Sequence, residues 1–239
     1  MARQKGIIKL SGTIGDINFY VAKGKGYARK AGGGFNSKSI KTKDSMQRVR
    51  ENGSEFGHCS MVKRKLLEAF KPYVLKRERG FHGKCMGLLL KLKGLDSVSK
   101  RGARNVLGGL QTLEGQRQFR NFPFGKPMKF LDAIAYQWHF ETISQRLTLP
   151  SFIRSDYDEL MSVNDIKIGL FMIDFDFEAL EFQKQLLDHK TISIQEKNPS
   201  QTLSPASAMP ISHTAIFYVG LELVSEIAGK GSVLGMRVV

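Results

Sequence analysis

The amino-acid sequence predicts an α+β protein in which a basic, glycine-rich N-terminal arm and a helical region precede a jelly-roll-like β-sandwich domain at the C-terminus. Three observations lead to this prediction. Glycine and basic residues are concentrated between residues 12 and 45, apolar and small residues recur at helical spacing from about residue 43, and strand-like runs fill the chain after residue 128. Helices and strands that occupy separate parts of a chain are typical of the α+β class.

The N-terminal segment is expected to be extended. Residues 7–21 contain Ile14, Ile17, Phe19 and Val21 between glycines, and β-branched and aromatic residues of this kind favour strands. Residues 22–37 have the composition of a loop or hairpin, because their five glycines tolerate positive φ angles among several basic residues. We expect residues 12–45 to act as a docking arm whose first strand adds to a sheet edge.

A helix is expected from about residue 44, where Asp44 or Ser45 can cap its start. Pro72 should disturb this helix near its end. Residues 85–113 are expected to form two short helices broken near Gly94, and residues 114–127 a loop or strand. The helical face predicted from the spacing consists of apolar and small residues: Met46, Val49, Gly53, Phe56, Gly57 and Ser60.

The C-terminal domain is predicted from alternating and β-branched runs separated by turn-rich spacers. The runs cover residues 135–152, 165–182, 190–194, 214–227 and 232–239. A polar loop rich in proline and serine separates the third run from the fourth, at residues 196–213. Several short strands with turn signals between them favour a sandwich of two sheets.

Charge divides the chain in the same way. The 239 residues carry a formal net charge of +15, with +21 in residues 1–130 and −6 in residues 131–239. We therefore predict two modules, residues 1–127 and 128–239, whose opposite charges attract each other within one chain or between copies. A hydrophobic fraction of 41% excludes general disorder.

Compartment and cofactor signals are few. We find no secretory signal and no apolar run of the roughly 20 residues that a membrane helix needs. Two cysteines make no disulfide framework, so a cytoplasmic location without membrane contact is expected. The pattern of a phosphate-binding loop is absent, and so is the fingerprint of a dinucleotide-binding fold. We predict no cofactor.

Two clusters with potential chemistry have simpler interpretations. The residue types of His58, Cys59, His82 and Cys85 suit zinc, but only the last two have the spacing of paired ligands, so ordinary helix residues are favoured over a metal site. Asp174, Asp176 and Glu178 should share one strand face and are interpreted as solvated, with cation binding or acid–base work as the alternative. No catalytic residue is predicted.

The basic arm carries the remaining signal. Lysines and arginines neutralise phosphates and aromatic rings stack on bases, so the arm suits nucleic acid as well as it suits a subunit interface. Both interpretations stay open. The residues predicted to bind nucleic acid or a partner are Lys23, Lys25, Tyr27, Arg29, Lys30, Lys38, Lys41, Lys43, Arg48 and Arg50.

Three segments, "SGTIGDINFY", "KGYARKAGG" and "IKTKDSMQRVRENGSEFG", together resemble a family of uncharacterised bacterial proteins of similar length. The resemblance covers roughly residues 6–57 well. It implies a glycine-rich arm, a helical middle, a β-rich C-terminal domain and a bacterial cytosolic origin. It implies no activity, cofactor or catalytic residue.

The predicted function is that of a non-enzymatic structural or assembly protein that self-associates through its basic arm. A basic arm joined to a β-sandwich also occurs in viral and phage coat proteins, which is an analogy of fold alone. The first alternative is a protein that binds DNA or RNA with little sequence preference, and the second is an enzyme with an unrecognised site. The expected partners are further copies of the chain, another protein, or nucleic acid.

Overall fold

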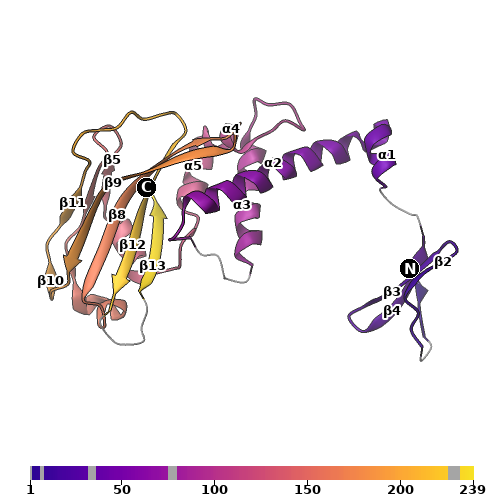
Figure 1. The fold of residues 1–239 in the computed structure, drawn as a ribbon, viewed down its shortest axis with the longest axis horizontal. Coiled ribbons are helices and arrows are strands. Elements are labelled where there is room, and N and C mark those ends of the chain that lie inside the picture. The colour runs from indigo at the N-terminus through magenta and orange to yellow at the C-terminus, as the bar shows by residue number, and fades with distance from the viewer. Residues whose placement is uncertain (1, 6–7, 32–35, 75–79, 226–231) are drawn as a thin grey trace. The chain divides into compact units, whose positions relative to one another are not determined.

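The computed structural model describes residues 2–5, 8–31, 36–74, 80–225 and 232–239 and shows an α+β protein, as predicted (Figure 1). The chain divides into two compact units, Met1–Asn52 and Gly53–Val239. This division differs from the boundary near residue 128 that the charge pattern suggested. No helix in the described part of the chain has the length and apolar character needed to cross a membrane.

The N-terminal unit contains a small antiparallel sheet with the strand order β1-β4-β3-β2. The expected extended arm is thus largely folded on itself. The stretch expected to add to a sheet edge, residues 13–21, spans β2 and β3: β3 has a neighbour on each side and is not free to do so, whereas β2 is an edge strand of this sheet. The strands are β1 (Ala2–Arg3), β2 (Gly12–Ile14), β3 (Ile17–Ala22) and β4 (Lys25–Lys30).

A two-residue turn joins β3 to β4 into a hairpin, one of the two forms expected for residues 22–37, of which residues 32–35 lie outside the described part of the chain. Lys23 and Gly24 have φ angles of 49° and 73°. Two positive φ angles are what a type I′ turn requires, and its twist matches that of the flanking strands. The turn sets the strand register, which places Tyr20 opposite Tyr27.

Two short helical segments follow the sheet: α1 (Ser37–Thr42) and a 3-10 turn at Asp44–Met46. The Asn36 side chain caps α1 by accepting a hydrogen bond from the Ser39 N–H at 2.7 Å. The long helix α2 (Gln47–Ala69) then begins, and it ends before Pro72 as predicted.

The helical part of the C-terminal unit contains the rest of α2 with α3 (Phe81–Leu95), α4 (Val106–Leu110) and α5 (Leu113–Arg120). Two helices were expected in residues 85–113, and α3 and α4 confirm them. The prediction of loop or strand for residues 114–127 was wrong for α5. Thr112 caps this helix by accepting a hydrogen bond from the Gly115 N–H, a local signal that the interpretation overlooked.

The strand-rich part is built around an antiparallel sheet with the order β13-β12-β8-β9. Its strands are β8 (Asp165–Asp176), β9 (Glu181–Ser193), β12 (Ala215–Val224) and β13 (Val233–Val238). A smaller sheet has the order β11-β6-β5 and consists of β5 (His139–Glu141), β6 (Arg146–Leu149) and β11 (Gln201–Leu203). The pair β7 (Phe152–Ile153) and β10 (Lys197–Asn198), two 3-10 turns (Arg154–Asp156 and Asp158–Leu160) and helix α6 (Lys129–Ala135) complete this unit.

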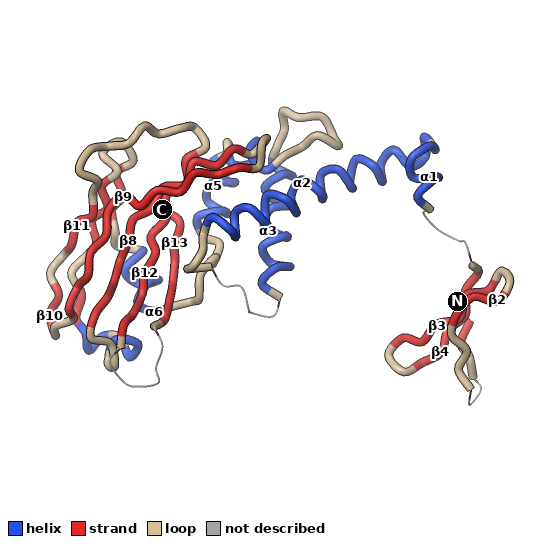
Figure 2. Tube along the Cα trace, viewed as in Figure 1, coloured by secondary structure: helices blue, strands red, loops and turns tan. Residues whose placement is uncertain are grey.

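The large sheet has a different layer on each face, which Figure 2 shows as helices and strands on either side of the long strands. Along β8, Phe171, Ile173 and Phe175 belong to a core shared with α2 and α3. The alternate positions in the first half of β8 belong to a second core, shared with α6, β6 and β11. Only one face of the large sheet is therefore sandwiched by strands.

The shared helical core explains why the units do not divide near residue 128. Leu66 of α2 and Leu89 of α3 lie in the same buried cluster as Tyr218 of β12. A core of this kind joins segments on both sides of residue 128 into one compact body. Neither of the two core clusters contains a residue before Cys59.

The buried face of α2 differs from the predicted one. Gly53 and Phe56 are exposed, and a Cβ atom added at Gly53 or Gly57 would meet no atom within 4 Å. Within the described part of the chain, these two glycines therefore do not serve the close approach of another element. The buried residues of α2 also recur at helical spacing, but they form a different face of the helix. They are Glu55, Cys59, Val62, Leu66, Leu67 and Ala69.

A buried carboxylate fastens α2 to the loop after α3. Glu55 is 1% exposed and forms an ion pair with Lys93. Its other oxygen accepts hydrogen bonds from the Gly102 N–H at 2.8 Å and from Arg104 Nε at 3.1 Å. Burial opposes the charge, but these three donors outweigh burial and lower the pKa of Glu55 to about 2.

Both cysteines are fully buried in the helical core, and burial raises the pKa of each thiol to about 11. We therefore expect both thiols to be unreactive toward Ellman's reagent at pH 8 in the folded protein, because only a minute fraction is thiolate and neither is accessible. Two thiols per chain should react once the protein is unfolded in guanidinium chloride. Rapid reaction of one thiol under native conditions would contradict this burial.

Candidate functional site

The ten residues predicted to bind nucleic acid or a partner all lie in the N-terminal unit. Five of them lie on the hairpin: Lys23 in its turn, and Lys25, Tyr27, Arg29 and Lys30 on β4. The other five, Lys38, Lys41, Lys43, Arg48 and Arg50, lie along the segment from α1 to the first turn of α2. The strand register separates the hairpin residues further, because successive side chains point to opposite faces of a sheet.

One face of the N-terminal sheet is basic and aromatic and is called the basic face below. Tyr20 and Tyr27 lie opposite each other, and their rings stack with centroids 5.6 Å apart and an interplanar angle of 23°. The Arg29 guanidinium lies 5.5 Å from the centre of the Tyr20 ring, within the range of a cation–π contact. By register and alternation the basic face carries Arg3, Tyr20, Lys25, Tyr27 and Arg29.

The opposite face of the sheet is apolar and is called the apolar face below. Ile14, Ile17 and Val21 are 64%, 46% and 48% exposed there, and Phe19 is half-buried beside them. Lys30 lies on this face, because it pairs with Ile17 across the two strands. The apolar face thus has a cation at one border.

The segment between α1 and α2 uses one of its predicted binding residues internally. Arg50 Nη1 donates to the carbonyl oxygens of Ile40 and Lys43, at 2.6 and 2.9 Å. These carbonyls lie near the end of α1, where a cation is favourable. Arg48 lies 3.3 Å from Glu51 on the same helix. The structure therefore gives Arg50 a structural contact.

A groove of about 630 Å³ in the C-terminal unit gathers carboxylates around apolar side chains. Asp174 and Asp176 are exposed on one face of β8, with the buried Phe175 between them, as predicted. The prediction was wrong for Glu178, which lies in the turn beyond the strand and not on its face; Glu181 begins β9. This acidic groove is lined by Leu107, Asp174, Asp176, Phe177, Glu178, Glu181, Phe182, Gln183, Ser212, His213 and Thr214.

Two of these carboxylates are held by local hydrogen bonds. Asp174 Oδ1 accepts from Ser212 Oγ at 2.5 Å and from Thr214 Oγ1 at 3.0 Å. Asp176 Oδ1 accepts from the N–H groups of Glu178 and Ala179, each at 2.8 Å, and these bonds lower its pKa. These hydrogen bonds fix both carboxylates in position, and those to Asp176 favour its ionised form.

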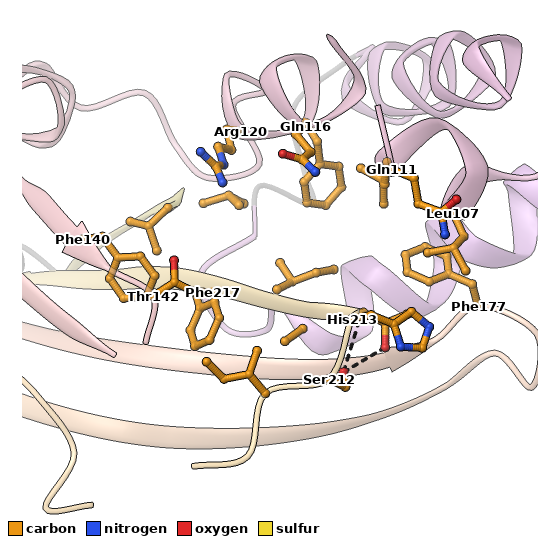
Figure 3. A pocket seen from close by; sticks show the side chains of 18 residues that line it. Leu107, Gln111, Gln116, Arg120, Phe140, Thr142, Phe177, Ser212, His213 and Phe217 are labelled. Carbon is orange, nitrogen blue, oxygen red and sulfur yellow. Dashed lines mark hydrogen bonds between the residues drawn. The ribbon is translucent and has the colours of Figure 1, made fainter. Parts of the chain in front are cut away.

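A second cavity, of about 450 Å³, lies next to the groove between α4, α5 and β12. Figure 3 shows Phe140 and Phe217 at one end of it, with Gln116 and Arg120 above them and Ser212 and His213 at the other end. The Ser212 hydroxyl is engaged by Asp174 and Thr214, not by the His213 ring. A serine nucleophile needs a base to take its proton, and here the Ser212 hydroxyl donates to the Asp174 carboxylate.

Of the four histidine and cysteine residues weighed as zinc ligands, Cys59 and Cys85 lie in the helical core, His58 is half-buried and His82 is exposed. His58 Nε2 accepts a hydrogen bond from the Val106 N–H at 3.4 Å, and burial lowers the pKa of His58. Cys59 Sγ lies 3.6 Å from the Leu89 carbonyl oxygen. Among the residues that the structure describes, no group of three or more His, Cys, Asp and Glu side chains is placed to hold a metal ion.

The residues predicted from the sequence leave out three members of these surfaces. Arg3 and Tyr20 join the basic face, and Glu181 joins the acidic groove. The signal for Tyr20 was present, because a two-residue turn at Lys23 and Gly24 fixes which residues face one another. Comparison with known proteins adds nothing to this site: no protein-family model and no curated protein matches the chain.

Proposed function

We propose that this protein is a structural assembly protein whose copies associate head to tail, with the N-terminal sheet of one copy docked in the acidic groove of the next. The observation that carries the proposal is the exposed apolar face of the N-terminal sheet, in a unit whose charge is opposite to that of the groove.

The apolar face supports docking because the small N-terminal sheet buries little of its own apolar surface. Ile14, Ile17 and Val21 each keep about half or more of their surface exposed. Small sheets need a covered hydrophobic face for stability. Contiguous apolar surface with a polar border is typical of a protein interface.

Charge complementarity favours a second copy as the occupant. Lys23 and Lys30 flank the apolar face at the turn and on β4. The acidic groove offers four carboxylates around Leu107, Phe177 and Phe182, so its apolar centre and acidic border match an apolar centre with a basic border. Complementary potentials of this kind direct association and suppress wrong partners.

An interface between two different surfaces has consequences for the assembly. Each copy offers one sheet and one groove, so association continues from copy to copy. Such heterologous contacts produce rings when the rotation closes and filaments when it does not. The proposed assembly is therefore larger than a two-fold symmetric dimer.

The test is the mass of the nuclease-treated, full-length protein by light scattering over a range of concentrations. We expect a wild-type mass well above that of one chain. The variant Ile17→Thr/Val21→Thr should be a monomer, because threonine keeps the β-branched shape but removes apolar surface. The matched control Val98→Thr/Ile143→Thr changes residues that are 91% and 84% exposed elsewhere and should assemble like wild type.

Two outcomes would contradict the proposal. A wild-type protein that stays monomeric at all concentrations has no such interface. A control variant that loses its assembly as completely as Ile17→Thr/Val21→Thr would show that surface apolarity in general, and not this face, drives association. Circular dichroism of each variant establishes that it is folded.

A further inference from the structure

The basic face of the N-terminal sheet remains without a role in the assembly proposed above. It lies on the side of the sheet opposite to the apolar face, because residues on one strand alternate between the two faces. Its composition is distinct: two tyrosines in the middle, three cations around them, and no carboxylate among its paired positions.

We propose that the basic face is a binding site for single-stranded nucleic acid. The inference rests on where the register places five side chains, of which Arg3 and Tyr20 were not among the predicted binding residues. It goes beyond the assembly function and uses a different set of side chains.

The tyrosine pair supplies a stacking platform. Tyr20 and Tyr27 are half-buried, and their rings stack together at a small interplanar angle. Unpaired bases stack on aromatic rings presented by a sheet, and each such contact contributes about 1–3 kcal/mol by alanine substitution. The Arg29 guanidinium beside Tyr20 adds a planar cation, which also stacks on bases.

The surrounding cations supply contacts to phosphate. Arg3 is paired with Tyr27 across β1 and β4, and Lys25 and Arg29 flank Tyr27 at alternate positions of β4. All three are exposed. Lysine and arginine next to a stacking surface track the phosphates of a strand whose bases lie on the rings.

Single strands are favoured over duplexes for a geometric reason. In a duplex the faces of the bases are hidden by stacking, so a flat aromatic pair has nothing to stack on. Stacking on the tyrosines tolerates any sequence, because every base has a flat aromatic face. We expect binding with little dependence on sequence.

The test is fluorescence anisotropy of a labelled 20-nucleotide oligothymidine, titrated with full-length protein at several salt concentrations. Three phosphate contacts predict that log K falls with log [salt] with a slope of magnitude about 2. Lys25→Gln/Arg29→Gln should lower this magnitude by about 1.4 on the same rule. The matched control Lys91→Gln/Lys126→Gln removes the same charge from two exposed positions of the C-terminal unit, and its slope should stay at the wild-type value.

A second pair of variants separates stacking from charge. Tyr27→Leu should weaken binding about tenfold, since one base stack contributes about 1–3 kcal/mol, whereas Tyr27→Phe should bind like wild type. Leucine and phenylalanine both preserve an apolar contact with Tyr20. Weaker binding of oligothymidine by Tyr27→Leu alone therefore points to base stacking. Circular dichroism and the oligomeric mass of each variant show that its sheet and its assembly are unchanged.

Three results would overturn the inference. The first is the absence of oligothymidine binding at low salt. The second is an equal loss of salt dependence in Lys25→Gln/Arg29→Gln and in the Lys91→Gln/Lys126→Gln control, which would mean a diffuse charge effect. The third is equal or tighter binding of a 20-base-pair duplex, which would assign the basic face to double-stranded phosphates or leave it to a protein partner.

Discussion

Replacing Glu55 by alanine is expected to lower the free energy of unfolding by about 3 kcal/mol, at the lower end of the range for breaking a buried ion pair. The substitution leaves Lys93 and Arg104 without their carboxylate and frees the loop around Gly102. The lower end applies because the side chains of Lys93 and Arg104 keep 17% and 26% exposure to solvent. Chemical denaturation at pH 7 measures the effect.

The matched control is Glu68→Ala on the same helix. Glu68 is half-exposed and lies 3.9 Å from Lys65 in a surface ion pair, so its removal should cost about 0.5 kcal/mol or less. Equal losses at Glu55 and Glu68 would show that the buried cluster has no special contribution to stability.

The same carboxylate makes stability depend on pH. The pKa of Glu55 is about 2 in the folded protein, below its ordinary value of 4.5. Because the pKa of Glu55 is lower in the folded protein, the stabilisation by its ionised carboxylate is fully present above about pH 4.5. It is lost as the pH falls toward about 2. We expect wild type to lose more stability than Glu55→Gln across this interval. Parallel pH profiles for the two proteins would contradict the assignment.

Gly109→Ala should destabilise the protein by about 2–3 kcal/mol, the upper range for overpacking a core. An added Cβ atom would lie 1.9 Å from the carbonyl oxygen of Leu92. That oxygen belongs to the backbone of α3, so it cannot move away as a flexible side chain would. The clash must be relieved by separating α4 from α3.

The control for this prediction is Gly94→Ala in α3, where an added Cβ atom meets nothing within 4 Å. Alanine has a higher helix propensity than glycine by about 1 kcal/mol, so this variant should be as stable as wild type or more so. Thermal unfolding of both variants measures the difference. A Gly109→Ala protein as stable as Gly94→Ala would refute the close packing of α3 and α4.

The parts of the fold that were predicted correctly are those with strong local signals. β8 and β12 contain β-branched and aromatic runs, and the hairpin contains glycine at a turn. β9 was mostly missed because it is an edge strand of the large sheet, and its sequence "EFQKQLLDHKTIS" is polar on a partly exposed surface. An edge strand of this kind has little need for apolar residues.

The buried face of α2 could not be predicted from spacing alone. Glu55 occupies a core-facing position only because Lys93 and Arg104, 38 and 49 residues further along, neutralise it. From sequence alone a charged residue is expected to face solvent. The periodicity therefore favoured the wrong face of α2. Contacts between residues this far apart depend on the tertiary fold.

The functional surfaces could likewise be predicted only in part. The basic character of the N-terminal segment was visible in its composition, but composition could not separate Lys25 and Arg29 from Lys30, which lies on the other face. The strand register makes that separation. The acidic groove needed the turn that brings Glu178 and Glu181 beside Asp174, together with the packing of Leu107 from α4.

Head-to-tail association is tested most directly by mixing two variants that each lack one half of the interface. Ile17→Thr/Val21→Thr loses the apolar face of the N-terminal sheet but keeps the acidic groove. Glu178→Lys/Glu181→Lys loses the acidic groove but keeps the apolar face. We expect each variant alone to be a monomer and an equimolar mixture to form a complex of twice the mass of one chain, measured by light scattering. A mixture that remains monomeric, or a groove variant that still assembles alone, would contradict the proposed interface.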